Sequence, residues 1–214
     1  PADAIVRGNF VRTADGQEQL SPATYKIKGI RRFKVEMDGG SATTFNEGRG
    51  ATTKSDGRKA LSPYSKATMR PVVLPFFSEI PSLISGDFKV AFKGTGTSIK
   101  EPCTQVHVEP NLSTVADPSG NLRYAGSMTL CISDASGLLL QAEFVRAMDT
   151  SPSALLPYVV RYSDYRKVGA LLVPFEHELL ISGRSILKFR ASGVELNVGL
   201  PDDEFAIPNA SEVR

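Results

Sequence analysis

Residues 158–208 read YVVRYSDYRKVGALLVPFEHELLISGRSILKFRASGVELNVGLPDDEFAIP, and this stretch decides the fold. Apolar and polar residues alternate with period two through several short runs, and each run is closed by Gly, Pro or Asp. The pattern predicts an antiparallel meander rather than a helix. One run points four side chains to the same face: Phe175, His177, Leu179 and Ile181. The tripeptide Ser182-Gly183-Arg184 follows and predicts a tight turn into a return strand.

The return strand changes phase part of the way along. The apolar alternation of Leu187, Phe189 and Ala191 resumes one residue out of step at Val194, after Ser192-Gly193. One extra residue within a strand indicates a β-bulge, which bends the strand and increases its twist. The stretch therefore predicts a sheet that curls.

Several motifs in and around this stretch resemble a known family. They are S-D-Y-R at 163–166, V-G-x-L-x-V-P-F at 168–175, V-E-L-N at 194–197 and P-D-D-x-F-x-I-P at 201–208, with N-terminal pieces at 27–29, 32–36 and 46–50. Their order resembles the bacterial outer-membrane lipoprotein-sorting proteins, the superfamily of the periplasmic lipoprotein carrier LolA and its receptor LolB. The resemblance implies an incomplete β-barrel lidded by helices, with lipid chains held in the interior. It also implies export to the periplasm or to the outer membrane.

The composition excludes several classes of protein. With 41% hydrophobic and 22% charged residues among 214, the chain has the values of an ordered globular protein. No Gly/Ser-rich or charged linker divides it, so we expect a single domain over residues 1–214. The most apolar segment, 72–84, is interrupted by Pro75, Glu79 and Pro81, which argues against a membrane-spanning helix. A net charge of +2 is too small to predict nucleic-acid binding.

A local basic cluster lies near the N-terminus. It consists of Lys26, Lys28, Arg31, Arg32 and Lys34. Two interpretations are open: a solvated sheet face, or a surface that contacts anionic lipid or a phosphate-bearing partner, including a transient membrane contact.

Residues 63–85 change from strand to helix periodicity. Eight apolar residues recur there at spacings of three and four: Met69, Val72, Val73, Phe76, Phe77, Ile80, Leu83 and Ile84. Pro71, Pro75 and Pro81 prevent a long helix, because proline is tolerated in a first turn but breaks a helix interior. We therefore predict short helical turns that cover the sheet as a lid.

Strand patterns flank this segment on both sides. Turns at Asp38-Gly39-Gly40 and Ser55-Asp56-Gly57 separate short strands before it, and further strands are predicted at 88–92, 103–109, 125–132 and 138–147. A total of about ten or eleven short strands is typical of a sandwich or barrel. We predict a mainly β (α+β) fold in which a curved antiparallel sheet forms an open, incomplete β-barrel covered by short lid helices.

No catalytic or metal-binding pattern stands out. His107 and His177 lie in separate predicted strands without metal-ligand spacing around them, so we interpret both as surface strand residues. Residues 94–98 predict a strand bend rather than a phosphate loop, because lysine precedes the glycines and no helix pattern follows. Asp202-Asp203-Glu204 predicts a solvated turn, since it lacks the spaced ligands of a calcium loop. We predict no enzyme activity, no cofactor and no metal.

The apolar residues of the lid and the sheet form the candidate ligand-binding set. They are Phe76, Phe77, Ile80, Val73, Leu83, Phe33, Val35, Phe88, Val90, Phe92, Phe144 and Phe189. Patterning does not separate a hollow interior from a filled one, so two interpretations are open. In the first, which the resemblance favours, the set lines a cavity for lipid, lipoprotein acyl chains or another hydrophobic small molecule. In the second, the set is a solid core of a structural or interaction module of the cell envelope.

Cys103 and Cys131 are predicted to form a disulfide, as expected of an exported protein, with two free cysteines as the alternative. A hairpin of 103–109 with 125–132 brings the two cysteines opposite each other. The same register makes four further pairs: Gln105 with Thr129, His107 with Ser127, Thr104 with Leu130, and Val106 with Met128. It matches polar with polar and mostly apolar with apolar residues, and a slip of one residue would destroy that match.

Overall fold

The structure is a computed structural model that describes residues 1–14, 17–61, 72–77, 79–84, 86–98, 101–113, 115, 117–148 and 151–207. Its strands are β1 (Asp3–Ala14), β2 (Gln17–Lys28), β3 (Arg32–Met37), β4 (Ser41–Asn46), β5 (Arg49–Lys54), β6 (Gly57–Ala60), β7 (Phe88–Ser98), β8 (Glu101–Pro110), β9 (Met128–Ser133), β10 (Leu139–Met148), β11 (Ser151–Val168), β12 (Leu171–Ile181) and β13 (Arg184–Leu196). They form one sheet in the order β6-β5-β4-β3-β2-β1-β13-β12-β11-β10-β9-β8-β7, so β6 and β7 are its two edges and the sheet is not closed. Every neighbouring pair is antiparallel.

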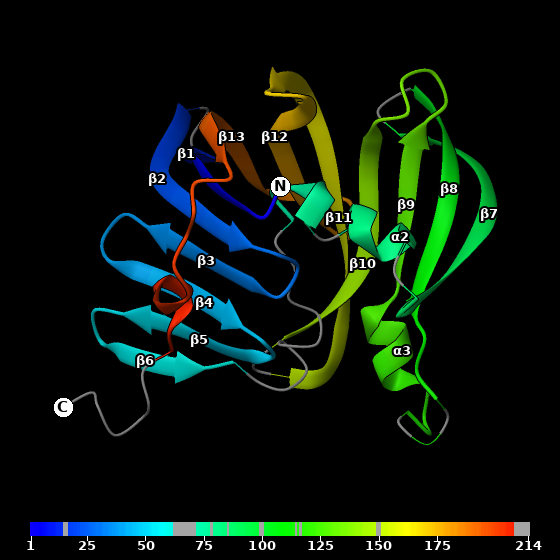
Figure 1. The fold of residues 1–214 in the computed structure, drawn as a ribbon, viewed down its shortest axis with the longest axis horizontal. Helices are drawn as coiled ribbons and strands as arrows, with labels where there is room; N and C mark the ends of the chain where they lie inside the picture. Colours follow the sequence, from blue (N-terminus) through cyan, green and yellow to red (C-terminus); the bar gives the residue numbers. More distant parts are fainter. Residues whose placement is uncertain are drawn as a thin grey trace.

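The open, curved antiparallel sheet confirms the predicted mainly β fold, with thirteen strands in place of about ten or eleven (Figure 1). The lid is smaller than predicted. In the described residues it consists of the 3-10 turn η1 (Pro75–Phe77) and the helix α2 (Glu79–Ile84). Met69 lies outside the described residues. The strand predicted from residue 125 begins later, because residues 125 and 126 end a helix, α3 (Asn121–Gly126), that the sequence did not reveal.

The predicted turns and bends of the sheet are found. Ser182 and Gly183 have positive φ angles of 49° and 77° and link β12 to β13. Arg7 pairs with Gly193 and Gly8 pairs with Ala191, which leaves Ser192 as the extra residue and confirms the predicted bulge. Gly8 is required there, since a Cβ atom at this position would lie 2.2 Å from the carbonyl oxygen of Arg190. The predicted bend in β7 is also confirmed by a register shift between Phe92 and Gly94.

Two groups of buried side chains occupy the same face of the sheet. The first core cluster joins β1, β2, β3, β12 and β13 and includes Ile27, Phe33 and Phe189. The second core cluster joins β8 to β11 and includes Met128 and Tyr162. The lid connects them, because Val73, Leu74 and Phe77 pack in the first cluster, whereas Val72 and Leu83 contact the second. Figure 1 accordingly shows α2 between the two wings of the curved sheet. Among the described residues, none of the helices is long and apolar enough to span a membrane.

Residues 197–207, which we call the C-terminal strap, contain the 3-10 helix η2 (Asp202–Phe205). In Figure 1 the strap, coloured orange to red, crosses β2, β3 and β4 on the face opposite the core clusters. The buried carboxylate of Asp3 accepts hydrogen bonds from the backbone N–H groups of Val198 at 2.7 Å and Leu200 at 2.8 Å. Phe205 is fully buried, and its carbonyl accepts a hydrogen bond from the Asn46 side chain at 3.1 Å. Both ends of the strap are therefore anchored.

The strap covers most of the predicted basic cluster. The printed ion pairs of its cations are Lys26 with Glu36 and Glu204, Lys34 with Glu36 and Glu204, Lys28 with Asp202, and Arg32 with Glu47 and Asp202. Arg31 is exposed. The sequence Asp202-Asp203-Glu204 is thus a docked element rather than a freely solvated turn, because two of its three carboxylates contact lysines or Arg32 of the sheet. Since four of the five cations are neutralised within the chain, this face is neither a simply solvated surface nor a free cationic patch for lipid.

Candidate functional site

The candidate site lies on the concave face of the sheet, which we define as the face that carries both core clusters and the lid. Strand pairing places the side chains of β7 to β12 in cross-strand rows. The first row is Val90, Val108, Met128, Phe144, Tyr158 and Ile181. The second row is Phe92, Val106, Leu130, Ala142, Val160 and Leu179. These apolar rows run from edge strand β7 to β12 without a charged residue.

Exposure changes along the apolar rows. In the middle, Val108, Met128 and Leu130 are buried, and Val72 and Leu83 of the lid pack against their cluster. At the edge of the sheet the rows emerge into solvent, with Val90 44% and Phe92 71% exposed. The neighbouring helix α2 contributes Ile80 at 44% and Ile84 at 87%, and α2 contacts β7. We call Val90, Phe92, Ile80 and Ile84 the exposed apolar edge. Leaving such side chains in water forgoes about 1.5–3 kcal/mol for each one that could be fully buried.

Eleven of the twelve predicted ligand-binding residues are divided between the two core clusters and the exposed apolar edge. Five of them are buried: Val73, Phe77, Phe33, Phe144 and Phe189. Three are half-buried against the clusters, namely Val35, Leu83 and Phe88, and three are exposed, namely Ile80, Val90 and Phe92. The side chain of Phe76 lies outside the described part of the structure. The first core cluster takes Val73, Phe77, Phe33, Val35 and Phe189, whereas the second takes Leu83, Phe88 and Phe144.

The prediction that His177 is a surface residue is wrong. His177 is only 4% exposed, and its ring stacks on Phe189 at a centroid distance of 5.1 Å and meets the edge of Tyr25 at 6.4 Å. Burial lowers the pKa of His177 to about 4, although the negative charge of Glu176 acts to raise it. The alternating pattern correctly places His177 on the same face as Phe175 and Leu179. That face is the buried one, so the pattern indicates a core position for His177 and not the surface position that we predicted. His107 is half-buried on the opposite, convex face.

Sequence reasoning did not single out Arg146, a charged residue on the concave face. It follows buried Ala142 and Phe144 at the period of β10, so strand alternation could have placed it there. Its guanidinium carbon lies over the ring of Tyr158, 6.0 Å from the ring centroid. Burial raises the pKa of the Tyr25 hydroxyl, on the opposite wing of the sheet, and the positive charge of Arg146 works against that rise.

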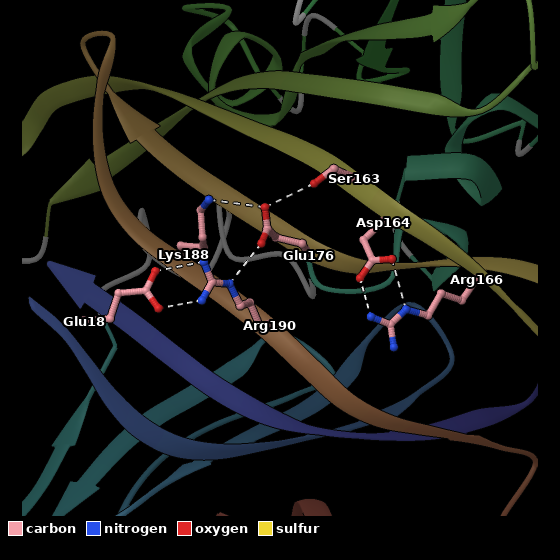
Figure 2. Close-up of polar contacts among 7 residues, drawn as sticks. All are labelled: Glu18, Ser163, Asp164, Arg166, Glu176, Lys188 and Arg190. Carbon is pink, nitrogen blue, oxygen red and sulfur yellow. Dashed lines mark hydrogen bonds and ion pairs between the residues drawn. The ribbon is translucent and has the colours of Figure 1, made fainter.

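The convex face of β11, β12 and β13 carries a closed network of ion pairs, which Figure 2 shows. Arg190 makes two hydrogen bonds to Glu18, of 2.7 and 2.9 Å, and one of 3.1 Å to Glu176. Lys188 lies 3.2 Å from Glu176, and the Ser163 hydroxyl donates to the same carboxylate at 3.3 Å. The network joins β2, β11, β12 and β13 and fixes the strands that carry the first core cluster, which is a structural rather than a chemical role.

The disulfide between Cys103 and Cys131 is confirmed, with a Cα–Cα distance of 5.4 Å. The predicted register is wrong by two residues. Cys103 pairs with Ser133 and Cys131 pairs with Gln105, so the disulfide joins the strands diagonally. A slip of two residues keeps every side chain on its face, which is why polar still meets polar in the register that is found.

A cavity of about 540 Å³ lies on the convex face, between α3 and the strands β8 to β11. Its charged lining includes Glu109, Glu143 and Arg123, and Val145 and Pro157 contribute apolar surface. Leu122 and Arg123 donate backbone hydrogen bonds of 3.1 and 2.8 Å to the buried Asp117 carboxylate, so α3 is firmly placed beside the cavity. Within the residues that the structure describes, no group of three or more His, Cys, Asp or Glu side chains could hold a metal ion.

Comparison with known proteins finds similar structures but no match by sequence. Neither a protein-family model nor a curated protein sequence matches this chain. A domain assigned to outer membrane lipoprotein sorting, from Vibrio parahaemolyticus, has a similar structure with a TM-score of 0.64 and 10% identity, over 95% of this chain and 89% of that one. A LolA superfamily protein from Nitrosomonas europaea matches with a TM-score of 0.62 and 15% identity, over 96% and 90% of the two chains. A DUF1329 family protein from Desulfovibrio piger matches with a TM-score of 0.62 and 12% identity, over 96% and 90%. The fold is therefore LolA-like, as the sequence motifs predicted.

Proposed function

We propose, from the LolA-like fold and the exposed apolar edge, that this protein is a non-enzymatic, exported protein that binds a hydrophobic ligand between the sheet and the lid. The ligand class is lipid, the acyl chains of a lipoprotein, or another apolar molecule. The observation that carries the proposal is that the apolar rows leave the core and reach solvent at Val90 and Phe92, beside the exposed Ile80 and Ile84 of α2. Contiguous exposed apolar side chains of this kind are typical of a binding surface.

The packing of the lid suggests where the ligand enters. The lid residues Val73, Leu74 and Phe77 fill the concave face at the first core cluster, so that half offers little room. At the second cluster, the described lid side chains that pack against the rows are Val72 and Leu83. An apolar chain that begins at the exposed apolar edge can extend under α2 by replacing helix contacts with its own, because both are apolar contacts of similar strength.

The disulfide supports the exported setting of this proposal, because disulfides persist in oxidising compartments such as the bacterial periplasm. We take the periplasm or the outer membrane as the setting, and a lipoprotein or lipid as the partner, from the kinds of protein that share this fold. At 10% and 15% identity that similarity supports the fold, and the partner rests on the exposed apolar edge.

The uncharged fluorophore N-phenylnaphthylamine tests this function. We expect saturable fluorescence enhancement by the wild type, and a loss of about tenfold or more in affinity when Val90→Ser and Phe92→Ser are combined, because roughly 1.5–3 kcal/mol of burial is removed for each side chain. Since both side chains are exposed, stability should change by less than about 1 kcal/mol. Leu172→Ser is the matched control, because Leu172 is 52% exposed on β12, away from the concave face, and should leave binding unchanged.

A second candidate function is a structural or interaction module that works through its outer surface. Two observations favour it: the first core cluster is filled by the lid, and the cavity of about 540 Å³ lies on the convex face. The same experiment separates the two functions. If the wild type gives no saturable binding of the fluorophore at micromolar concentration, the hydrophobic-ligand proposal fails and the interaction module is favoured.

A further inference from the structure

We propose that the cavity between α3 and the strands β8 to β11, which we call the convex cavity, is a second binding site, for a short peptide with free termini and apolar side chains. The C-terminal carboxylate of the peptide binds Lys93 and its N-terminal ammonium binds Glu109, both of which line the cavity. The site lies on the opposite face of the sheet from the exposed apolar edge, so this inference goes beyond the proposed function and does not depend on it.

Helix α3 forms a fixed wall of the convex cavity. It contacts β8 and β10, and Figure 1 shows it beside the ends of these strands. Its start is held by two backbone hydrogen bonds to Asp117. Its end is held by a hydrogen bond of 2.7 Å from the Ser127 hydroxyl to the Arg123 carbonyl, and a Cβ atom on Gly126 would lie 2.5 Å from Pro110 of β8. The cavity is therefore preformed, and a ligand does not have to order the protein in order to bind.

A bulge in β7 brings a lysine over the cavity. The register of β7 with β8 shifts between Phe92 and Gly94, so Lys93 is the extra residue. A bulge re-aims the side chain of its extra residue. The Lys93 ammonium reaches across β8 and donates a hydrogen bond of 3.3 Å to the hydroxyl of Thr129 on β9. Among the described residues it makes no ion pair, so its charge is left for a ligand in the cavity.

Carboxylates lie on both sides of this ammonium. Glu143 pairs with Thr129 from β10 and accepts a hydrogen bond of 2.8 Å from Gln141. Glu109 lies on β8, two residues beyond the partner of Thr129, and makes no ion pair within the described residues. A simple anion at Lys93 would lie near both carboxylates, and a simple cation at Glu109 would lie near Lys93. A zwitterion instead places each of its charges beside the opposite one.

The spacing of the two groups selects a peptide. Glu109 is one strand spacing and two residues away from Thr129, where the Lys93 ammonium lies. With about 4.8 Å between strands and about 3.4 Å for each residue, this separation is roughly 8 Å. An extended chain covers about 3.3–3.6 Å for each residue, so about two or three residues join the two groups.

The rest of the lining suits apolar side chains. Val145 and Pro157 pair across β10 and β11, Val159 follows on the same face, and the ring of Tyr124 on α3 is 58% exposed. Covering these groups with the side chains of a peptide removes apolar surface from water. The cavity volume of about 540 Å³ lies within the range of roughly 300–1,000 Å³ that small-molecule sites occupy.

Isothermal titration calorimetry with trileucine tests the site. We expect saturable binding by the wild type with a dissociation constant of about 0.1 mM or tighter. N-acetyl-trileucine lacks the ammonium and trileucine amide lacks the carboxylate, so each should bind about tenfold more weakly. Glu109→Gln should weaken trileucine about tenfold but change N-acetyl-trileucine by less than about twofold, because both changes remove the same ion pair. Lys93→Gln should have the corresponding effects on trileucine and trileucine amide.

Two controls accompany the test. Lys89→Gln removes the same charge from an exposed residue of β7 outside the cavity lining, and it should bind trileucine as the wild type does. Free leucine carries both charges on one residue and does not span the distance from Lys93 to Glu109, so it should bind about tenfold more weakly than trileucine or worse.

The outcomes separate this inference from the proposed function. Absence of saturable trileucine binding by the wild type would overturn it. Equal binding of trileucine and its two blocked forms would do the same, as would a loss in Glu109→Gln that is as large for N-acetyl-trileucine as for trileucine. Because the two sites lie on opposite faces, trileucine can fail to bind while N-phenylnaphthylamine still binds, and the reverse. Should a variant fail to fold, the comparison of the three peptides on the wild type still decides the question.

Discussion

At the scale of single residues, the S-D-Y-R motif stabilises the sheet. Asp164 has a positive φ of 53° and makes hydrogen bonds of 3.0 and 2.6 Å to Arg166, as Figure 2 shows. Arg166 in turn lies over the ring of Phe175, 4.5 Å from its centroid. The hydroxyl of Tyr165 donates to the carbonyl of Leu139 at 2.6 Å. The motif therefore joins β11 to β12 and to the start of β10, which explains why it indicates a fold and not an activity.

The burial of His177 predicts a pH-dependent stability. The folded protein keeps the ring neutral down to about pH 4, whereas in the unfolded chain it takes up a proton near pH 6.5. The unfolded chain therefore binds more protons than the folded one between these pH values. The contribution of neutral His177 to the free energy of unfolding is full above pH 6.5 and is lost as the pH falls toward 4. At about 1.4 kcal/mol for each pKa unit, we expect a loss of roughly 3 kcal/mol, measured as the free energy of unfolding in urea.

Two variants check this assignment. His177→Phe should flatten the decline between pH 6.5 and pH 4, because the aromatic stack with Phe189 is kept and the titrating group is removed. His107→Gln changes a half-buried histidine on the convex face and should leave the decline as it is. Equal slopes for the wild type and His177→Phe would contradict the prediction.

At the scale of elements, the C-terminal strap depends on Glu204. Hydrogen bonds from Lys26 and Lys34 lower the pKa of the Glu204 carboxyl. A lowered pKa in the folded state contributes stability above the ordinary value of 4.5, and the contribution is lost as the pH falls below it. We expect Glu204→Gln to cost about 1–2 kcal/mol at neutral pH and almost nothing in acid, by urea denaturation at both conditions.

The control for the strap is a second carboxylate in an ion pair. Glu195 contacts Arg7, and both side chains are about half exposed. Glu195→Gln should therefore cost less than about 1 kcal/mol, since exposed pairs contribute little. A cost at Glu204 no larger than that at Glu195, or one that persists unchanged in acid, would show that the ion pairs of Glu204 do not hold the strap.

Sequence patterns predicted those elements that depend only on residues close together in the chain. The turn at Ser182-Gly183 and the bulge at Ser192 follow from residue types and phase along one strand. The register of Cys103 and Cys131 was missed by two residues, because a pattern with period two is unchanged by such a slip. Helix α3 was missed since its start depends on Asp117, four residues before the helix, and not on periodicity.

At the scale of the whole molecule, two properties of the candidate site lay beyond the sequence. Phe92 and Phe189 both lie beside a lysine in a strand with alternating residues, yet one is 71% exposed on an edge strand and the other is fully buried on a central one. Only the order of strands in the sheet separates them. The ion pairs of Lys26 and Lys34 with Glu204 likewise join residues that are far apart in the chain. The basic cluster near the N-terminus therefore could not be predicted from the acidic residues 202–204, nor the reverse.

The burial of Phe189 in the first core cluster and the exposure of Phe92 at the edge of the sheet predict different costs at these two phenylalanines. Phe189→Ala should lower the free energy of unfolding by about 3–5 kcal/mol, because it empties a packed site in the first core cluster. It should leave the affinity for N-phenylnaphthylamine within about twofold of wild type. Phe92→Ala should do the opposite, with a small change in stability and weaker binding. A Phe189→Ala variant that keeps full stability would contradict the tight packing of the first core cluster.

The place of β1 in the sheet constrains the order in which the chain can be completed. β1 lies between β2 and β13, and Asp3 holds the strap through backbone groups of residues 198 and 200. Of the described strands, β1 is synthesised before all others, and both of its edges are paired only after β13 has been made. If the protein is exported as we propose, this delay keeps the native state out of reach until β13 has also crossed a translocation channel, so the chain stays threadable for longer.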